Sequence, residues 1–203
     1  MFTLKFDKIL QNKFEIRTYN VLLVFQVNCP GCLSHAIPLF NTLYHRYKKD
    51  VNFLALSTAF EDFTLNTEEN TKFLLEEGKL VGESKNYFKK MNRERYEQAI
   101  DFPVAMDKIS KSNDIIDENF IQQIVNTNPN YPTWPIFEQE TMIEKVRSYY
   151  AKSELLPYTF TSNQLGGTPS YVFFDENFKI FRERFGHFPA EEFEEIISTW
   201  LQK

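Results

Sequence analysis

The sequence predicts an α/β protein with a helical insertion. Residues 21–27 form an apolar run that is typical of a buried strand. From Cys32 onward, apolar residues recur at steps of three and four, as on the buried face of a helix. Strand-like and helix-like segments then alternate to the C-terminus, except at residues 108–160, which are mainly helical in pattern.

Length and composition fit one folded domain. The chain has 203 residues, of which 42% are hydrophobic and 25% charged, so it can bury a sizeable core. The net charge of −5 argues against nucleic acid as a main partner. No stretch reaches the roughly 18 apolar residues of a membrane span. We therefore expect a single domain over residues 1–203, with neither nucleic acid nor a membrane as partner.

The first residues do not resemble a secretory signal. Residues 1–8 have no apolar core of the usual length, about 7–15 residues, and no small-residue cleavage site. The expected location is therefore the cytoplasm, or the periplasm if a signal has been removed.

Four segments besides residues 21–27 have the pattern of strands before residue 108. Residues 2–6 alternate in polarity and residues 14–19 do so more loosely, which predicts an N-terminal hairpin or edge strand. Residues 51–57 predict a second core strand. Residues 102–106 predict a short strand that the chain enters through a proline.

Two further helices are expected between these strands. Asn66 or Thr67 caps a helix that runs through Glu77, and Gly78 ends it. Residues 84–99 have the pattern of a second helix, with a solvated basic face.

Residues 108–160 have the pattern of an insertion. A helix is predicted at 113–125, a loop with three prolines at 126–135, and a second helix at 138–152. This segment is too structured for a linker and too short for a separate domain. We expect it to influence the choice of substrate.

The C-terminal part predicts a hairpin followed by a helix. Residues 171–174 and 178–184 form its strands around a turn at 175–177, and Pro189 opens the helix in its first turn. The buried side of this helix should contain Phe193, Ile196, Ile197, Trp200 and Leu201. The core between sheet and helices should contain Val21, Leu23, Phe25, Phe53, Ala55, Leu56, Val172 and Phe174.

Both cysteines of the chain lie in one motif, Cys29-Pro30-Gly31-Cys32, where the strand meets the helix. Free N–H groups and the helix dipole stabilise an anion at such an N-terminus, so a thiol there can ionise below its ordinary pKa of about 8.5. A disulfide across two residues constrains the unfolded chain little. The pair therefore indicates catalysis, redox sensing or metal binding.

Metal binding is the weaker reading of this motif. A structural zinc site normally has four ligands, and only His35, His45 and His187 could add nitrogen donors. His35 lies one turn beyond Cys32 and is a candidate modulator of the thiols. We expect His45 and His187 to be surface residues, and we expect no metal and no cofactor.

Three segments together resemble the thioredoxin superfamily, and within it the TlpA-like and AhpC/TSA-type redoxins. They are residues 25–38 around the cysteines, residues 102–107, and Gly167-Thr168-Pro169-Ser170 with its hairpin. The resemblance covers residues 20–107 and 161–203. It implies a thioredoxin-like three-layer α/β/α sandwich.

The resemblance also implies roles for individual residues. Cys29 would be the exposed nucleophile and Cys32 the buried resolving thiol. Pro169 would be a cis-proline that faces the pair, and Thr168 would offer backbone groups to a substrate. Pro30 and Gly31, between the cysteines, would also contact the substrate.

The activity implied is that of a thiol–disulfide oxidoreductase. Its substrates would be protein or small-molecule disulfides and dithiols, and a redox partner would donate or accept the electrons.

This chain departs from the family pattern at four places. Between the cysteines, Pro30-Gly31 replaces the Gly-Pro of thioredoxin. Leu23 occupies the position of thioredoxin's buried aspartate, so the residue that exchanges protons with Cys32 is not identified. Asn28 occupies the position of a tryptophan. Pro38 follows Cys32 by six residues instead of five.

Two other functions stay open. The first is a peroxiredoxin-like thiol peroxidase, whose pattern has a proline and a threonine where this chain has Leu22 and Gln26. The second is a non-catalytic redox-sensing module, in which the disulfide changes how the insertion docks to a partner.

Overall fold

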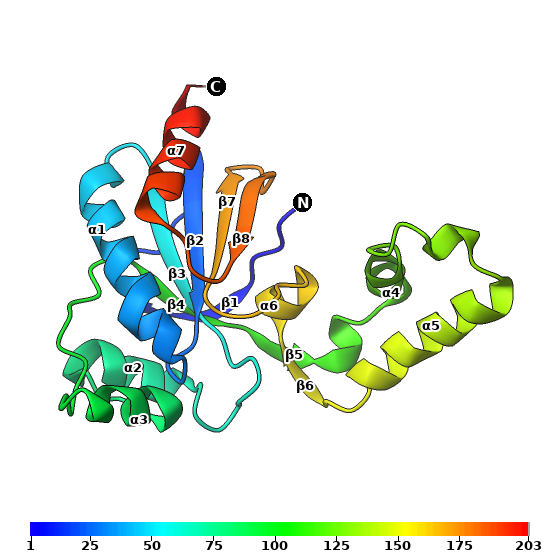
Figure 1. Ribbon diagram of the computed structural model, residues 1–203, viewed down its shortest axis with the longest axis horizontal. Helices are drawn as coiled ribbons and strands as arrows, with labels where there is room; N and C mark the ends of the chain where they lie inside the picture. The colour runs from blue at the N-terminus through cyan, green and yellow to red at the C-terminus, as the bar shows by residue number, and fades with distance from the viewer. Residues whose placement is uncertain (203) are drawn as a thin grey trace.

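The computed structural model describes residues 1–202 and has a mixed sheet with helices packed against it (Figure 1). The strands of the sheet lie in the order β1-β4-β3-β2-β7-β8. Their bounds are β1 Phe6–Gln11, β2 Tyr19–Phe25, β3 Asn52–Ser57, β4 Val104–Asp107, β7 Ser170–Asp175 and β8 Ile180–Phe185. Strands β2, β3 and β4 are parallel, whereas β1, β7 and β8 run antiparallel to their neighbours. The predicted α/β class is confirmed.

One face of the sheet packs against α1 (Ile37–Tyr47) and α7 (Ala190–Leu201), which lie side by side in Figure 1. Alternate residues of each strand point to this face, because successive side chains of a strand point to opposite sides. Phe40 from α1 and Phe193 from α7 meet the strand residues there. This face includes Val21, Leu23, Phe25, Phe53 and Ala55.

The opposite face is covered by α6 (Tyr158–Ser162) and by the N-terminal segment. Phe2 and Phe14 pack there against the other set of strand residues, and so does Phe160 from α6. That set includes Leu22, Val24, Leu54, Leu56, Val172 and Phe174. All eight residues predicted for the core are buried, since the central strands are apolar on both faces.

An N-terminal edge strand is present, as one of the two alternatives predicted, but its bounds differ. The strand is β1, at residues 6–11, which pairs with β4 at the edge of the sheet and forms no hairpin with residues 14–19. Phe14 and Ile16 instead pack against the hydrophobic cluster on the face of the sheet that α6 covers. Alternation in a short segment does not reveal which partner strand is nearby.

The helix that contains Cys32 has a π-helical turn at Cys32–Ala36, in which the N–H of Ile37 donates to the carbonyl oxygen of Cys32. Pro38 follows in the first turn of α1. A π turn contains one residue more than an α turn. It therefore accommodates the additional residue that separates Pro38 from Cys32.

Helix α2 (Glu68–Glu77) has the predicted ends. The side chain of Thr67 accepts a hydrogen bond from the N–H of Asn70, and Gly78 ends the helix in the left-handed conformation. Helix α3 (Gly82–Lys90) is shorter than the helix predicted at 84–99, since it ends at Lys90. Asn92 has a φ of 58°, which takes the backbone out of the helix.

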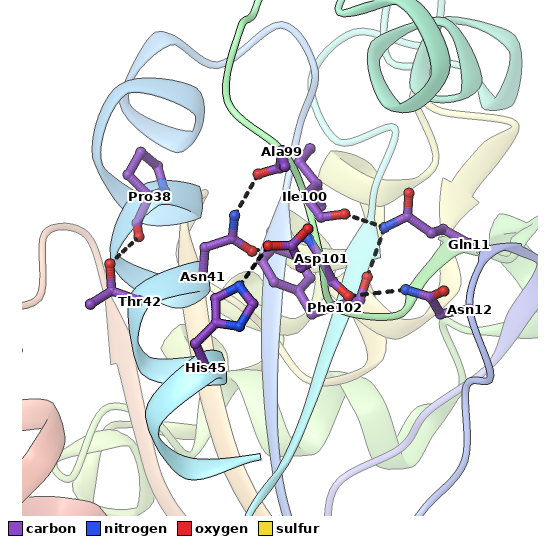
Figure 2. A network of polar contacts seen from close by, with 10 residues as sticks. All are labelled: Gln11, Asn12, Pro38, Asn41, Thr42, His45, Ala99, Ile100, Asp101 and Phe102. Carbon is purple, nitrogen blue, oxygen red and sulfur yellow. Dashed lines mark hydrogen bonds and ion pairs between the residues drawn. The ribbon is translucent and has the colours of Figure 1, made fainter.

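The extended segment after α3 is held by polar side chains of α1 and β1 (Figure 2). Asn41 donates to the carbonyl oxygen of Ala99 and accepts from the N–H of Asp101, while His45 lies 2.6 Å from the Asp101 carboxylate. Gln11 donates to two carbonyl oxygens of the same segment. These contacts position the start of β4.

Residues 109–157 form an arm that projects from the sheet (Figure 1). Its base is a two-stranded ribbon of β5 (Ile109–Lys111) and β6 (Leu155–Pro157), which the sequence did not predict. Beyond it lie α4 (Glu118–Val125) and α5 (Ile136–Tyr150), where two helices were expected. Ile121 and Val146 belong to a small hydrophobic cluster between these helices.

The C-terminal hairpin of β7 and β8 is as predicted. Pro189 lies just before α7 as its N-cap residue, not within the first turn. Of the residues predicted for the buried side of this helix, Phe193, Ile197 and Trp200 are buried and Ile196 is partly buried. Leu201 is exposed, contrary to the prediction, because it is the last residue of the helix. No helix within residues 1–202 is both long enough and apolar enough to cross a bilayer.

Candidate active site

Cys29 and Cys32 are joined by a disulfide just beyond the end of β2, where the helix begins. Cys32 is completely buried and belongs to the core between the sheet and α1. Cys29 is half-buried at the edge of that core. Cys29 is therefore the more accessible residue of the pair, and Cys32 is enclosed.

The surroundings of the Cys29 sulfur come from two distant segments. The N–H of Cys32 donates a 3.1 Å hydrogen bond to Cys29 Sγ. The carbonyl oxygen of Thr168 lies 3.8 Å from the same atom. The Thr168–Pro169 peptide bond is cis, as expected. The structure thus brings the cis-proline segment against the accessible cysteine.

Pro30 and Gly31 form the first helical turn between the cysteines, and both are half-buried. Pro30 has no N–H, so it cannot donate a hydrogen bond to the sulfur. The donor to Cys29 is therefore supplied from Cys32, one turn into the helix.

Gln26 connects three segments around the cysteines. Its buried side chain accepts a 2.6 Å hydrogen bond from the Thr168 hydroxyl and donates to the carbonyl oxygen of Phe60. From the sequence, Gln26 was a candidate only as the residue at the threonine position of the peroxidase pattern. No signal in the sequence identifies its two partners, which lie 34 and 142 positions away.

Asn28 holds the loop after β3 and the start of α3. Its N–H donates to Asn66, and its side chain donates to Asp62 and accepts from the N–H of Glu83. Gly82 is required at this contact, because a Cβ there would lie 2.2 Å from the Asn28 side-chain oxygen. At the position of thioredoxin's tryptophan, this chain thus has an asparagine that links the loop after β3 to the start of α3 by hydrogen bonds.

His35 and His187 lie beside the motif on its exposed side. Their ring centroids are 4.9 Å apart in an edge-to-face arrangement, and His35 also contacts the Ser34 hydroxyl. A Cβ on Gly31 would lie 3.8 Å from His187. His187 is on the surface, as expected, but its place next to Gly31 was not predicted from the sequence.

Two solved structures are similar to this chain over nearly its whole length. A thiol-disulfide isomerase from Corynebacterium glutamicum is 20% identical, with a TM-score of 0.57 over 99% of this chain and 95% of that one. A protein described as belonging to the thioredoxin-like superfamily is 20% identical, with a TM-score of 0.54 over 98% and 94%. The chain has a thioredoxin-like fold. No protein-family model matches the sequence, and the comparison with curated proteins gives no match.

Within this thioredoxin-like fold, the buried carboxylate lies on another strand. Leu23 is apolar, but Asp107 at the end of β4 is completely buried. Burial raises the pKa of Asp107 to about 6, against the opposing effect of hydrogen bonds from Thr159, Phe160 and Thr58. Two of these donors are N–H groups in the first turn of α6, so Asp107 anchors that helix.

Asp62 organises the loop after β3. The hydroxyl of Thr64 lowers the pKa of Asp62, and further hydrogen bonds from the backbone of Leu65 and Thr64 and from Asn28 act in the same direction. Among residues 1–202, no group of three or more His, Cys, Asp or Glu side chains is arranged to hold a metal ion.

Proposed function

We propose that this protein is a thiol–disulfide oxidoreductase that acts through Cys29 and Cys32. The observation that supports this most directly is the position of the half-buried Cys29 sulfur, 3.8 Å from the carbonyl oxygen before the cis-proline. The thioredoxin-like fold agrees with this reading. So does the name of one structurally similar protein, a thiol-disulfide isomerase.

The reaction would proceed in two exchanges. In the reduced protein, the Cys29 thiolate attacks one sulfur of a substrate disulfide and releases the other sulfur as a thiolate. Cys32 then loses its proton and attacks Cys29 in the resulting mixed disulfide. The substrate leaves as a dithiol, and the protein keeps the Cys29–Cys32 disulfide. Two electrons pass to the substrate, and a dithiol partner returns them; the reverse sequence oxidises a dithiol.

The local geometry suits these roles. The N–H of Cys32 already donates to the Cys29 sulfur, and in the reduced protein the same hydrogen bond would stabilise a thiolate. Cys32 is enclosed next to Cys29, so the sulfur within its reach is that of Cys29, and a substrate sulfur does not reach it directly. Thr168 and Pro169 would position the substrate chain against Cys29.

Parallel assays test this proposal. We expect the reduced protein to reduce the disulfides of insulin and to consume hydrogen peroxide much more slowly. The Cys29→Ser variant should lose insulin reduction. Peroxide consumption faster than insulin reduction would instead indicate a thiol peroxidase. If neither activity is seen but a partner binds only the oxidised form, the protein is a redox-sensing module.

A further inference from the structure

A groove of about 580 Å³ lies where the arm joins the rest of the fold. Its walls come from the loop after β3, the end of α5, and α6 with the turn that follows. Its apolar lining includes the aromatic residues Phe60, Phe63, Tyr149, Tyr150 and Phe160, together with Leu156, Pro157 and Leu165. Grooves of about 300–1,000 Å³ with mainly apolar walls commonly bind ligands in proteins.

The groove presents aromatic side chains to solvent. Phe63 is 41% exposed and Tyr149 is 66% exposed, although both are large. Phe60 is fixed in the wall, because its ring stacks on Phe160 with centroids 4.0 Å apart. Glu61 and Lys152 bring charges of both signs, so the groove does not favour a ligand of one charge.

The groove is connected to the cysteines. Gln26 donates to the carbonyl oxygen of Phe60 and accepts from Thr168, so one wall is tied to the cis-proline segment. Leu165 lies three residues before Thr168, which limits their separation to about 11 Å. The Thr168 carbonyl oxygen is 3.8 Å from Cys29 Sγ. The nearer end of the groove is therefore within roughly 15 Å of the reactive sulfur, a span of about four or five extended residues.

We propose that this groove binds the polypeptide chain of a protein substrate and accepts an aromatic or large aliphatic side chain about four or five residues from the substrate cysteine. This inference rests on the proposed function, because the mixed disulfide at Cys29 holds the substrate chain beside the groove. Glutathione has one residue on either side of its cysteine and is too short to reach. The substrate class is thus a protein disulfide in an extended or unfolded segment.

The loop that forms one wall is organised before substrate arrives. Asp62 accepts hydrogen bonds from the N–H groups of Thr64 and Leu65, and Asn28 donates to the same carboxylate. A wall that is already ordered loses little conformational entropy on binding.

A pair of peptide disulfides tests the inference. Each peptide contains a single cysteine, which forms a mixed disulfide with a small thiol. The first peptide carries Phe five residues from this cysteine, and the second carries Ala at the same position. Peptides are made with the substitution on either side of the cysteine. For the wild-type protein, we expect kcat/KM to be roughly tenfold higher with Phe than with Ala on one side, since the ring loses its contact with water in the groove.

Variants locate this preference. Phe63→Ser, Tyr149→Ser and the double variant alter exposed residues, so the fold should be retained. In the double variant the ratio should fall to near one. Phe137→Ser is the matched control, since Phe137 is 78% exposed on the same helix as Tyr149 but does not line the groove. Its ratio should stay at the wild-type value.

Three results would overturn the inference: no preference in the wild type, a preference that survives in the double variant, or one that Phe137→Ser removes equally. If neither peptide reacts with any of the proteins, the proposed function itself is wrong. If the peptides do react but at equal rates with Phe and with Ala, only the inference about the groove is wrong.

Discussion

The hydroxyl of Thr168 donates a 2.6 Å hydrogen bond to the side-chain oxygen of Gln26, a residue 142 positions earlier in the chain. Thr168 is the residue before the cis-proline, and Gln26 lies three residues before Cys29. This bond therefore joins the two segments that surround the accessible sulfur. The same amide group also donates to the loop after β3, through Phe60.

Replacing Gln26 should weaken this junction. Gln26→Leu leaves the Thr168 hydroxyl without its acceptor, which should cost about 1–3 kcal/mol in free energy of unfolding. Thr168→Val removes the same bond from the other side and should cost less. Denaturant unfolding of both variants and of the double variant measures the coupling, which should be roughly 1 kcal/mol. Strict additivity of the two changes would show that the bond contributes nothing.

Asn28 should be a structural rather than a reactive residue. Asn28→Ala removes side-chain bonds to Asp62 and to the N–H of Glu83, so we expect a loss of about 2 kcal/mol in unfolding free energy. Asn86→Ala, at an exposed position of α3, should cost less than about 0.5 kcal/mol. Urea unfolding compares the two, and equal losses would contradict the proposed role of Asn28.

Asp107 should make stability fall as pH rises. Its pKa of about 6 in the folded protein is above the ordinary value of 3.8, so folding favours its protonated form. The resulting stabilisation is complete below about pH 4 and is lost as pH rises through 6, at up to about 1.4 kcal/mol per pH unit.

Two measurements check this prediction. The carboxyl carbon of Asp107 should titrate with a midpoint near 6 in NMR spectra. In the Asp107→Asn variant, the fall in unfolding free energy that Asp107 causes between pH 4 and pH 7 should be absent. A midpoint below 4 would contradict the effect of burial described above.

Local sequence patterns predicted the features that neighbouring residues determine. The apolar run at 21–27 predicted β2, and Thr67 and Gly78 predicted both ends of α2, because caps depend on residues within one turn. The cis bond at Pro169 followed from a family resemblance and not from local physics.

Features that depend on distant partners could not be predicted. Gln26 gave no sign that its amide would reach both Thr168 and Phe60. His187 was not expected beside Gly31, since the fold alone brings residues so far apart together. The short strands β5 and β6 also escaped detection, because three residues are too few to show a period.

In the proposed reaction, Cys29 attacks the substrate and Cys32 resolves the mixed disulfide. The most direct measurement is to incubate reduced Cys32→Ser and Cys29→Ser proteins with a disulfide-containing protein such as insulin, then to identify covalent complexes by non-reducing electrophoresis and mass spectrometry. We predict that Cys32→Ser accumulates a complex linked through Cys29, because attack still occurs and resolution does not. Cys29→Ser should accumulate none. A complex that forms in Cys29→Ser and is absent from Cys32→Ser would show that the two cysteines have the opposite roles.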